Sequence, residues 1–254
     1  MKAAASGMIA QQARFEVLAN NLANVDTPGF RRQMAAVASQ GDHALAAYDP
    51  AGAKTKSLGM VSSGVQVAAA GFDLTHGALQ STKRDLDVAI PGDGFLAVSV
   101  NGKTAYTRAG AIQFRADGVL TDLKGNPYLD QGGQPITVPK GVGEEGVRIG
   151  PSGEVLSLQK NAAGKMEYVE VARLQVADVD PKTLKAVGDR LYEGTGTPQA
   201  KDKVSLAVQT IEGSNVTVVS AMTEMITALR AYEANSKVMQ AINDVTGKAI
   251  NDLK

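Results

Sequence analysis

Residues 218–239, VVSAMTEMITALRAYEANSKVM, repeat apolar side chains at steps of three and four residues, and the repeat extends toward residue 253. Its members are Val218, Met222, Met225, Leu229, Tyr232, Met239, Ile250 and Leu253. Residues 8–25 carry a similar stripe, whose members are Met8, Phe15, Leu18, Leu22 and Val25. Alternating steps of three and four residues, or sums of them, are typical of a coiled coil. We therefore expect a helix at each end of the chain, and we expect the two to pack together and against other copies.

The boundaries of these helices follow from residues that interrupt the pattern. The first helix is predicted from about Ala3 to Val25, because Pro28 disfavours helical backbone at the residue before it. The second is predicted from Thr217 almost to the end of the chain. Asparagines crowd into the last turns of the first helix, where this residue type is unfavourable. Their amides are expected to bond to backbone or to a neighbouring subunit, with a frayed polar helix end as the alternative.

Between the helices the sequence predicts short strands joined by turns. Asn101-Gly102 separates Phe95–Val100 from Thr104–Thr107, and this dipeptide favours a two-residue hairpin because both residues tolerate positive φ. Similar turn signals recur every 8–12 residues, which is typical of an antiparallel sandwich or barrel. The predicted fold class is α+β, with a discontinuous N- and C-terminal helical coiled-coil domain and a central all-β domain.

Three regions are predicted along the chain. Residues 1–30 plus 215–254 form the discontinuous coiled-coil domain, and residues 71–214 form the central β domain. Residues 31–70 are expected to be an extended linker with one extended strand pair, since Ala, Ser, Gly and Gln dominate and apolar alternation is weak. Such a composition is permissive enough to bend, or to become ordered only on contact with partners.

The composition excludes several classes of function. The 26 basic and 26 acidic residues balance, so the chain offers no long-range field to attract nucleic acid or an anionic membrane. The absence of cysteine excludes disulfides, thiolate metal sites and cysteine nucleophiles. No apolar run is long enough to insert into a membrane as a spanning helix. The short apolar stretch near the N-terminus is not a secretory signal, so any export is expected to occur without a cleaved signal of that kind.

A glycine-rich segment matches the spacing of a dinucleotide-binding motif but lacks its context. Gly141–Gly146 reads G-x-G-x-x-G, and the motif requires a helix after the glycines to hold the pyrophosphate. Val147–Ile149 instead predicts a strand, and Glu144 and Glu145 place negative charge where phosphate would lie. A loop between strands is the favoured interpretation, and no cofactor is expected.

The titratable residues give no clear catalytic or metal site. Asp85, Asp87 and Asp93 lie close in sequence, and carboxylate pairs can serve acid–base chemistry or bind calcium. A solvated strand face is the favoured interpretation, with compensation from a nearby cation: Lys83, Arg84 or Arg108. His43 and His76 have no evident metal or triad partner in the sequence and are interpreted as lone surface histidines. No catalytic, cofactor-binding or metal residue is therefore predicted.

Three blocks of sequence resemble the flagellar rod–hook family of bacterial axial proteins. Residues 18–32, LANNLANVDTPGFRR, look like the family's N-terminal signature. Residues 86–95, LDVAIPGDGF, with YTRAG at 106–110, are similar to the run that begins its β domain. EGSNV at 212–216, with RAYEAN at 230–235, looks like its C-terminal signature. The blocks occur in the family's order, although Leu96 stands where the family often has a second Phe.

The resemblance implies a structural subunit of the flagellar basal-body rod. Such a subunit polymerises into a helical tube that crosses the periplasm, transmits torque and encloses the export channel. The implied partners are other copies of the chain, other rod and hook proteins, ring proteins and the type III export apparatus. Export without a cleaved signal peptide, paired terminal helices in an inner wall and β domains in an outer layer are also implied. Neither nucleic acid nor membrane insertion is expected.

The residues expected to serve assembly lie on or beside the two stripes. They are Leu18, Asn20, Asn21, Leu22, Asn24, Asn215, Met222, Met225, Leu229, Arg230, Tyr232, Glu233, Asn235 and Met239. Because isolated helices depend on tertiary packing, we expect the terminal helices to be poorly ordered in the monomer. Two rival interpretations remain open. One is a β-barrel enzyme that acts on peptidoglycan through its aspartates, and the other is a monomeric adhesin or coiled-coil binding module.

Overall fold

The computed structural model describes residues 2–48, 54–62, 64–139, 141–161, 164–188 and 190–251, and the chain divides into two compact units. The first, here called the terminal unit, consists of Met1–Ala23, Gln33–Gly71 and Thr217–Lys254. The second, here called the β unit, consists of Asn24–Arg32 and Phe72–Val216. Because three segments of one unit alternate with two of the other, the chain passes between the units four times.

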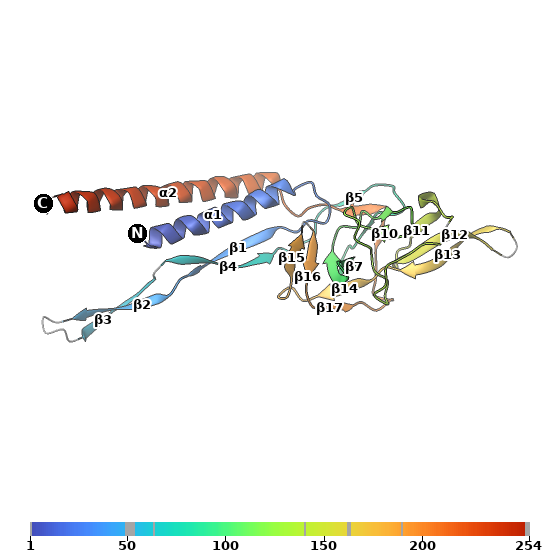
Figure 1. Ribbon diagram of the computed structural model, residues 1–254, viewed down its shortest axis with the longest axis horizontal. Coiled ribbons are helices and arrows are strands. Elements are labelled where there is room, and N and C mark those ends of the chain that lie inside the picture. Colours follow the sequence, from blue (N-terminus) through green and yellow to red (C-terminus); the bar gives the residue numbers. More distant parts are fainter. Residues whose placement is uncertain are drawn as a thin grey trace. The chain divides into compact units, whose positions relative to one another are not determined.

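Two helices lie side by side in the terminal unit, as the stripes predict (Figure 1). They are α1, Lys2–Ala23, and α2, Val218–Asn251. Thr217, a residue type favoured at the N-cap, precedes α2. The first helix ends two residues before the expected Val25, where the amide of Thr27 donates to the carbonyl of Asn24 in a turn. The predicted stripe member Leu253 lies outside the described residues.

Small residues allow the two helices to approach closely. Ala221 and Ala228 are the buried hydrophobic residues of α2, and Ala10 and Leu18 are those of α1. A Cβ atom added at Gly7 would lie 3.0 Å from the Nδ2 atom of Asn235. The buried residues of the two helices are therefore mostly alanines, with Leu18 as the large member of a predicted stripe that is also buried.

The segment expected to be a linker forms two strand pairs. β1, Gln33–Ser39, pairs with β4, Val65–Phe72, while β2, Asp42–Tyr48, pairs antiparallel with β3, Lys54–Ser62. The register of β2 and β3 shifts twice, and such bulges interrupt the two-residue alternation by which strands are recognised. The interrupted alternation explains why the strand pattern of β2 and β3 is weak in the sequence. The sequence Asp49-Pro50-Ala51-Gly52 also predicts a turn, and these four residues lie outside the described ones.

The β unit is antiparallel, which confirms the predicted α+β class. A six-stranded sheet has the order β15-β16-β8-β7-β14-β17, and a three-stranded sheet has the order β11-β12-β13. The first consists of Lys185–Gly188, Leu191–Glu193, Lys103–Thr107, Phe95–Val100, Val176–Val179 and Gly196–Pro198. The second consists of Val147–Ile149, Glu154–Lys160 and Met166–Arg173. A short 3-10 helix, Glu144–Gly146, precedes β11, so a strand follows the glycine-rich loop as predicted.

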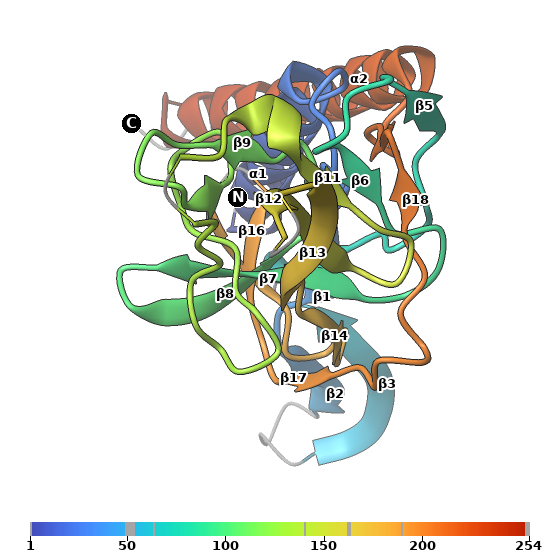
Figure 2. The same cartoon turned by 90° about the vertical axis from the view of Figure 1, so that its right-hand side faces the viewer.

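Three short strand pairs complete this unit. β9, Gln113–Phe114, pairs with β10, Leu120–Thr121. β18, Ala207–Val208, pairs with β6, Val88–Ala89, as Figure 2 shows, and β19, Thr210–Glu212, pairs with β5, Leu79–Ser81. The last two pairs join the beginning of the β unit to its end.

The predicted hairpin at Asn101-Gly102 is confirmed. β7 and β8 flank this dipeptide and pair from Leu96–Thr107 to Val100–Lys103. The φ angles of Asn101 and Gly102 are 51° and 78°, as a type I′ turn requires. The turn signal in the sequence therefore fixed both the position and the register of the hairpin.

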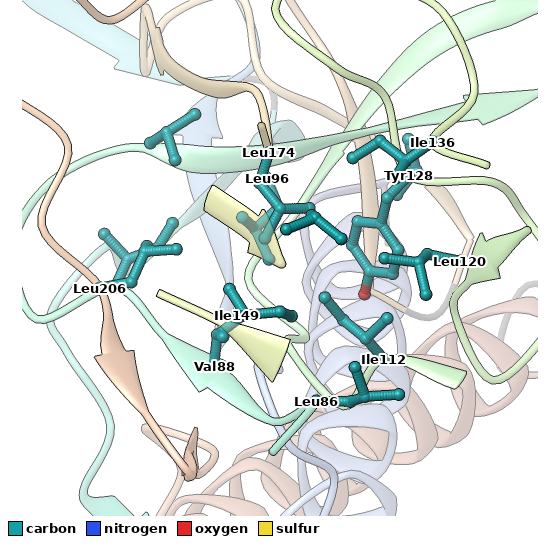
Figure 3. Packing of buried hydrophobic residues seen from close by; sticks show 14 of the residues in the cluster. Leu86, Val88, Leu96, Ile112, Leu120, Tyr128, Ile136, Ile149, Leu174 and Leu206 are labelled. Atoms are coloured by element: carbon teal, nitrogen blue, oxygen red, sulfur yellow. The ribbon is translucent and has the colours of Figure 1, made fainter. Parts of the chain in front are cut away.

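Large hydrophobic side chains fill the core of the β unit. They include Leu86, Val88, Leu96, Ile112, Leu120, Tyr128, Ile136, Ile149, Leu174 and Leu206 (Figure 3). The hydroxyl of Tyr128 donates to the carbonyl of Ala109 over 2.7 Å, and complete burial raises the pKa of this phenol. Among the described residues, no helix is long and apolar enough to cross a membrane.

Candidate functional site

An apolar stripe on α2 is exposed to solvent in the terminal unit. Val219, Met222, Ile226 and Leu229 follow one another at steps of three, four and three residues, and their exposed fractions are 78%, 49%, 52% and 45%. These steps place them along one side of a helix, beside the face that carries the buried alanines Ala221 and Ala228. Contiguous apolar surface of this kind marks interaction sites in soluble proteins. The four residues are called the α2 stripe below.

A groove between α1 and α2 continues this apolar surface. Phe15 of α1 and Leu229 and Tyr232 of α2 line it, together with Gln11, Gln12 and Ala228, and its volume is about 330 Å³. The side-chain oxygen of Gln11 is buried and has no hydrogen-bond partner among the described residues. Two of the predicted assembly residues thus lie in a hollow, not in the contact between the helices.

The predicted assembly residues divide into three groups by exposure. Leu18 and Asn21 are buried. The half-buried ones are Leu22, Asn24, Asn215, Met225, Asn235 and Met239. The exposed ones are Asn20, Met222, Leu229, Arg230, Tyr232 and Glu233. The exposed group is the one that other molecules can reach directly.

The amide of Asn21 is used inside the chain. Its Nδ2 atom donates to the carbonyl of Gln33 over 2.9 Å, and its Oδ1 atom accepts from the amide of Gln33 over 2.8 Å. This pair of bonds fastens the end of α1 to the first residue of β1. Asn21 therefore has a structural role within the terminal unit, and its predicted role between subunits stays a prediction.

The β unit contains a buried ionic cluster where its segments meet. The Nη2 atom of Arg31 lies 2.7 Å from Oε1 of Glu212, and the Nη1 atom of Arg108 lies 3.4 Å from Oε2. The side chains are 1%, 3% and 0% exposed for Arg31, Arg108 and Glu212. The amide of Gly77 also donates to Oε1 over 2.9 Å. One carboxylate thus joins three separate segments of the chain.

Two guanidinium groups share the carboxylate of Glu212. Burial lowers the pKa of Arg108, and the charge of Arg31 lowers it further, whereas Glu212 opposes both effects. Arg108 also donates to the carbonyl of Ile90 and lies over the ring of Phe95, 5.2 Å from its centroid. Removing one partner of such a buried pair destabilises a fold by about 3–5 kcal/mol, because it leaves a charge uncompensated.

Asn215 lies three residues after Glu212, and its side chain also bonds to residues far away in the sequence. Its Oδ1 atom accepts from the amide of Arg32 over 2.7 Å. Its Nδ2 atom donates to the carbonyl of Asp73 over 2.8 Å and to that of Thr75 over 3.0 Å. The amide thus bridges residues 32, 73 and 75, and the predicted role of Asn215 between subunits stays a prediction.

A glycine permits the N-terminal loop to approach the core. Gly29 has a φ of 73°, and a Cβ atom added there would lie 2.3 Å from the amide nitrogen of Ala109. Its amide donates to the carbonyl of Glu212 over 2.7 Å. A side chain at this position would push the loop away from both Ala109 and Glu212.

The aspartates that define the rival enzyme hypothesis are engaged differently from one another. Asp87 is buried and lies 3.1 Å from Nη1 of Arg84, which is one of the cations expected to compensate it. Asp85 lies 2.9 Å from Nε of Arg148, a partner that the sequence analysis did not name. The side chain of Asp93 is exposed. The three carboxylates therefore do not converge on one another as a pair for acid–base chemistry would.

His76 was interpreted as a lone surface residue but borders the ionic cluster. Its Nδ1 atom lies 3.8 Å from Oε1 of Glu212, and its Nε2 atom lies 3.9 Å from Oδ1 of Asp93. His43 belongs to β2. Sequence separation hid the first of these contacts, since residue 212 is far along the chain. Among the described residues, no group of three or more His, Asp or Glu residues could hold a metal ion.

Models of three protein families match successive parts of this chain. One described as "Flagella basal body rod protein" matches residues 1–31. One described as "Flagellar hook protein FlgE/F/G D1 domain" matches residues 89–157, and one described as "Flagellar basal body rod FlgEFG protein C-terminal" matches residues 207–253. Arg31, Arg108 and Glu212 lie one in each matched range, so the ionic cluster joins all three.

Full-length relatives carry names consistent with these matches. The chain is 33% identical to the flagellar basal-body rod protein FlgG of Agrobacterium fabrum, over 99% of this chain and 98% of the relative. It is 34% identical to FlgF of Salmonella typhimurium, over 97% and 93%. It is 35% identical to FlgG of Caulobacter vibrioides, over 96% and 95%. The similarity thus extends through both units.

Proposed function

The chain belongs to the flagellar basal-body rod protein family, and we propose on this premise that it is a structural subunit of the flagellar rod. In this role it polymerises with other copies into a helical tube that transmits torque and encloses the export channel. The family resemblance expected from the sequence is confirmed by relatives that align over nearly the whole chain.

The observation that carries this proposal is the exposed α2 stripe. Its four side chains belong to a helix that already has a packed face, so they are not needed for the contact with α1. Burying one Val, Leu, Ile or Met side chain fully contributes about 1.5–3 kcal/mol, so several together favour association strongly. Other copies of the chain are the proposed partners that cover this surface.

Further predicted assembly residues flank the stripe. Arg230, Tyr232 and Glu233 are exposed on α2, and Tyr232 lines the groove between the helices. Tyrosine and arginine are common anchors of protein interfaces because they combine large contact area with polar groups. We assign these residues to contacts between subunits, together with Met222 and Leu229.

The remaining features of the proposed role come from the family. The chain acts in the flagellum, where it contacts other rod and hook proteins, ring proteins and the export apparatus. It reaches the periplasm without a cleaved signal peptide. No catalytic step is part of this role, and the ion pairs of Asp85 and Asp87 support a structural use of these carboxylates.

A charge placed in the α2 stripe tests the proposal. Ile226→Lys puts an ammonium group in a surface that assembly must dehydrate, whereas Thr227→Lys puts the same group at an adjacent exposed position outside the stripe. Electron microscopy of concentrated protein is expected to show tubes for the wild type and for Thr227→Lys. Ile226→Lys is expected to leave particles without tubes.

Both variants should keep the wild-type melting temperature, because isolated surface substitutions change the free energy of unfolding by no more than about 0.5 kcal/mol. Tubes formed equally well by Ile226→Lys would contradict the role of the stripe. Monodisperse wild-type protein at every concentration would instead favour a monomeric adhesin or binding module.

A further inference from the structure

Several residues that bond to one another lie beside the four boundaries at which the chain passes between its two units. The boundaries follow Ala23, Arg32, Gly71 and Val216. Glu212 and Asn215 lie just before the last boundary, and their partners lie beside two others. We call the set Arg31, Arg32, Asp73, Glu212 and Asn215 the crossing node, and all of its members belong to the β unit.

Two side chains hold the node together. Glu212 binds Arg31, one residue before Arg32, and its carboxylate also accepts from the amide of Gly77. Asn215 accepts from the amide of Arg32 and donates to the carbonyls of Asp73 and Thr75. The amide of Asp73 donates directly to the carbonyl of Arg32 over 2.9 Å. Arg32, Asp73 and Asn215 each lie beside a different boundary, and hydrogen bonds join the three residues to one another.

These bonds are of kinds that hold the backbone of the node firmly within the β unit. Bonds to ionised groups are short and roughly twice as strong as neutral ones, and a buried site strengthens them further. The two oxygens of Glu212 bind different arginines, so the carboxylate also connects the node to Arg108 at the end of β8. The neutral amide of Asn215 bonds to three backbone groups without needing a counter-ion.

We propose that the crossing node is a mechanical joint: it fixes the points at which the chain leaves the β unit, and Glu212 and Asn215 are its positioning residues. This proposal rests on the proposed function, since only a subunit that transmits torque must carry force along these passages. It assigns Asn215 to a contact inside the subunit. It also explains why Arg31, Arg108 and Glu212 come from the three separate segments that match rod and hook families.

Asn215→Ala is the variant that tests the joint, because it removes the hydrogen bonds of the amide to residues 32, 73 and 75 without burying a charge. Its matched control is Asn161→Ala, which removes an amide that accepts from Lys165. Asn215→Asp is a second variant, since it keeps an acceptor for the amide of Arg32 and loses the bonds that the amide donates to Asp73 and Thr75.

Amide hydrogen exchange on the purified full chain measures the node itself. Asn215→Ala is expected to speed exchange at Arg32 by about tenfold, because a net hydrogen bond is worth about one factor of ten in opening. Exchange at Ala97 in β7, whose amide donates to Gln175, should not change. Asn215→Asp should change Arg32 less than Asn215→Ala does. Unchanged exchange at Arg32 in Asn215→Ala would overturn the node.

The mechanical role is tested by flagellar rotation under load in cells that carry each variant as their only copy of the protein. We expect Asn215→Ala cells to form the wild-type number of rods and hooks, but to lose rotation speed when tethered or placed in viscous medium. Asn161→Ala cells should rotate as the wild type does. Wild-type rotation under load in Asn215→Ala cells would overturn the joint and leave the proposed function standing.

Two further outcomes are also decisive. Asn215→Ala protein that keeps its melting temperature but builds no rods would identify the node as an assembly surface and overturn the joint. Wild-type protein that is absent from isolated rods would overturn the proposed function itself. The two failures are therefore distinguishable.

Discussion

The β unit and the terminal unit of this protein are stabilised in opposite ways. Leu96, Leu120 and Leu174 are almost completely buried within the β unit. The terminal unit buries alanines between its helices and exposes Met222, Ile226 and Leu229. Under the proposed function, the exposed apolar side chains of α2 serve contacts with other copies, whereas the buried ones of the β unit serve its own fold.

Truncating one buried and one exposed leucine should give very different losses of stability. Leu120→Ala empties part of the β core and should lower the free energy of unfolding by about 2–5 kcal/mol. Leu229→Ala removes the same atoms from an exposed position and should change it by less than about 0.5 kcal/mol. Urea denaturation of dilute protein measures both.

Assembly should reverse the order of the two leucine variants. Leu229→Ala loses apolar area that other copies cover, so it should raise the protein concentration needed for tubes. Leu120→Ala protein that remains folded at low temperature should assemble near the wild-type concentration. Equal losses of stability in both variants would contradict the comparison.

Low pH is expected to have a smaller effect on stability, through Asp73 of the crossing node. Hydrogen bonds from the hydroxyl and the amide of Thr75 hold the pKa of Asp73 below its usual value of 3.8, with help from the charges of Arg32 and Arg31. The folded state therefore binds this proton less readily than the unfolded state does. The resulting stabilisation is complete above the usual pKa and is lost as the pH falls below it.

Removing the carboxylate should flatten that part of the acid response. The melting temperature of Asp73→Asn is expected to fall less than that of the wild type between about pH 4 and pH 2, over which carboxylates titrate. Thr75→Val removes one of the two donors and should act in the same direction. A wild-type slope in both variants would show that Asp73 contributes nothing to the acid response of the β unit.

Much of the fold could be predicted from the sequence because its signals are local. Three- and four-residue spacing predicted both helices, and Asn101-Gly102 predicted the β7–β8 hairpin with its register. Over residues 31–70 the sequence predicts a linker with one strand pair, whereas the structure has two pairs, because small residues dominate there and bulges interrupt the alternation of β2 and β3. Spacing also could not tell which face of α2 meets α1, since that depends on close approach at Ala221, Ala228 and Gly7.

The site was harder to predict because its contacts are not local. The bond from Arg31 to Glu212 spans 181 residues, and that from Arg32 to Asn215 spans 183. Family signatures marked these residues, but nothing near them in the sequence indicated that they bond to each other. The exposed stripe was easier to predict, since periodicity alone indicates Met222 and Leu229 as members of an apolar stripe.

Methionine oxidation tests the central claim, that other copies cover the α2 stripe, most directly. Met222 in α2 is 49% exposed and Met166 in the β unit is 55% exposed, so dilute hydrogen peroxide should oxidise both at similar rates in the monomer. Mass spectrometry of assembled tubes should then show Met222 protected by about tenfold relative to monomer, since buried thioethers react slowly. Met166 should be protected much less. Equal oxidation of Met222 in monomers and in tubes would contradict the account.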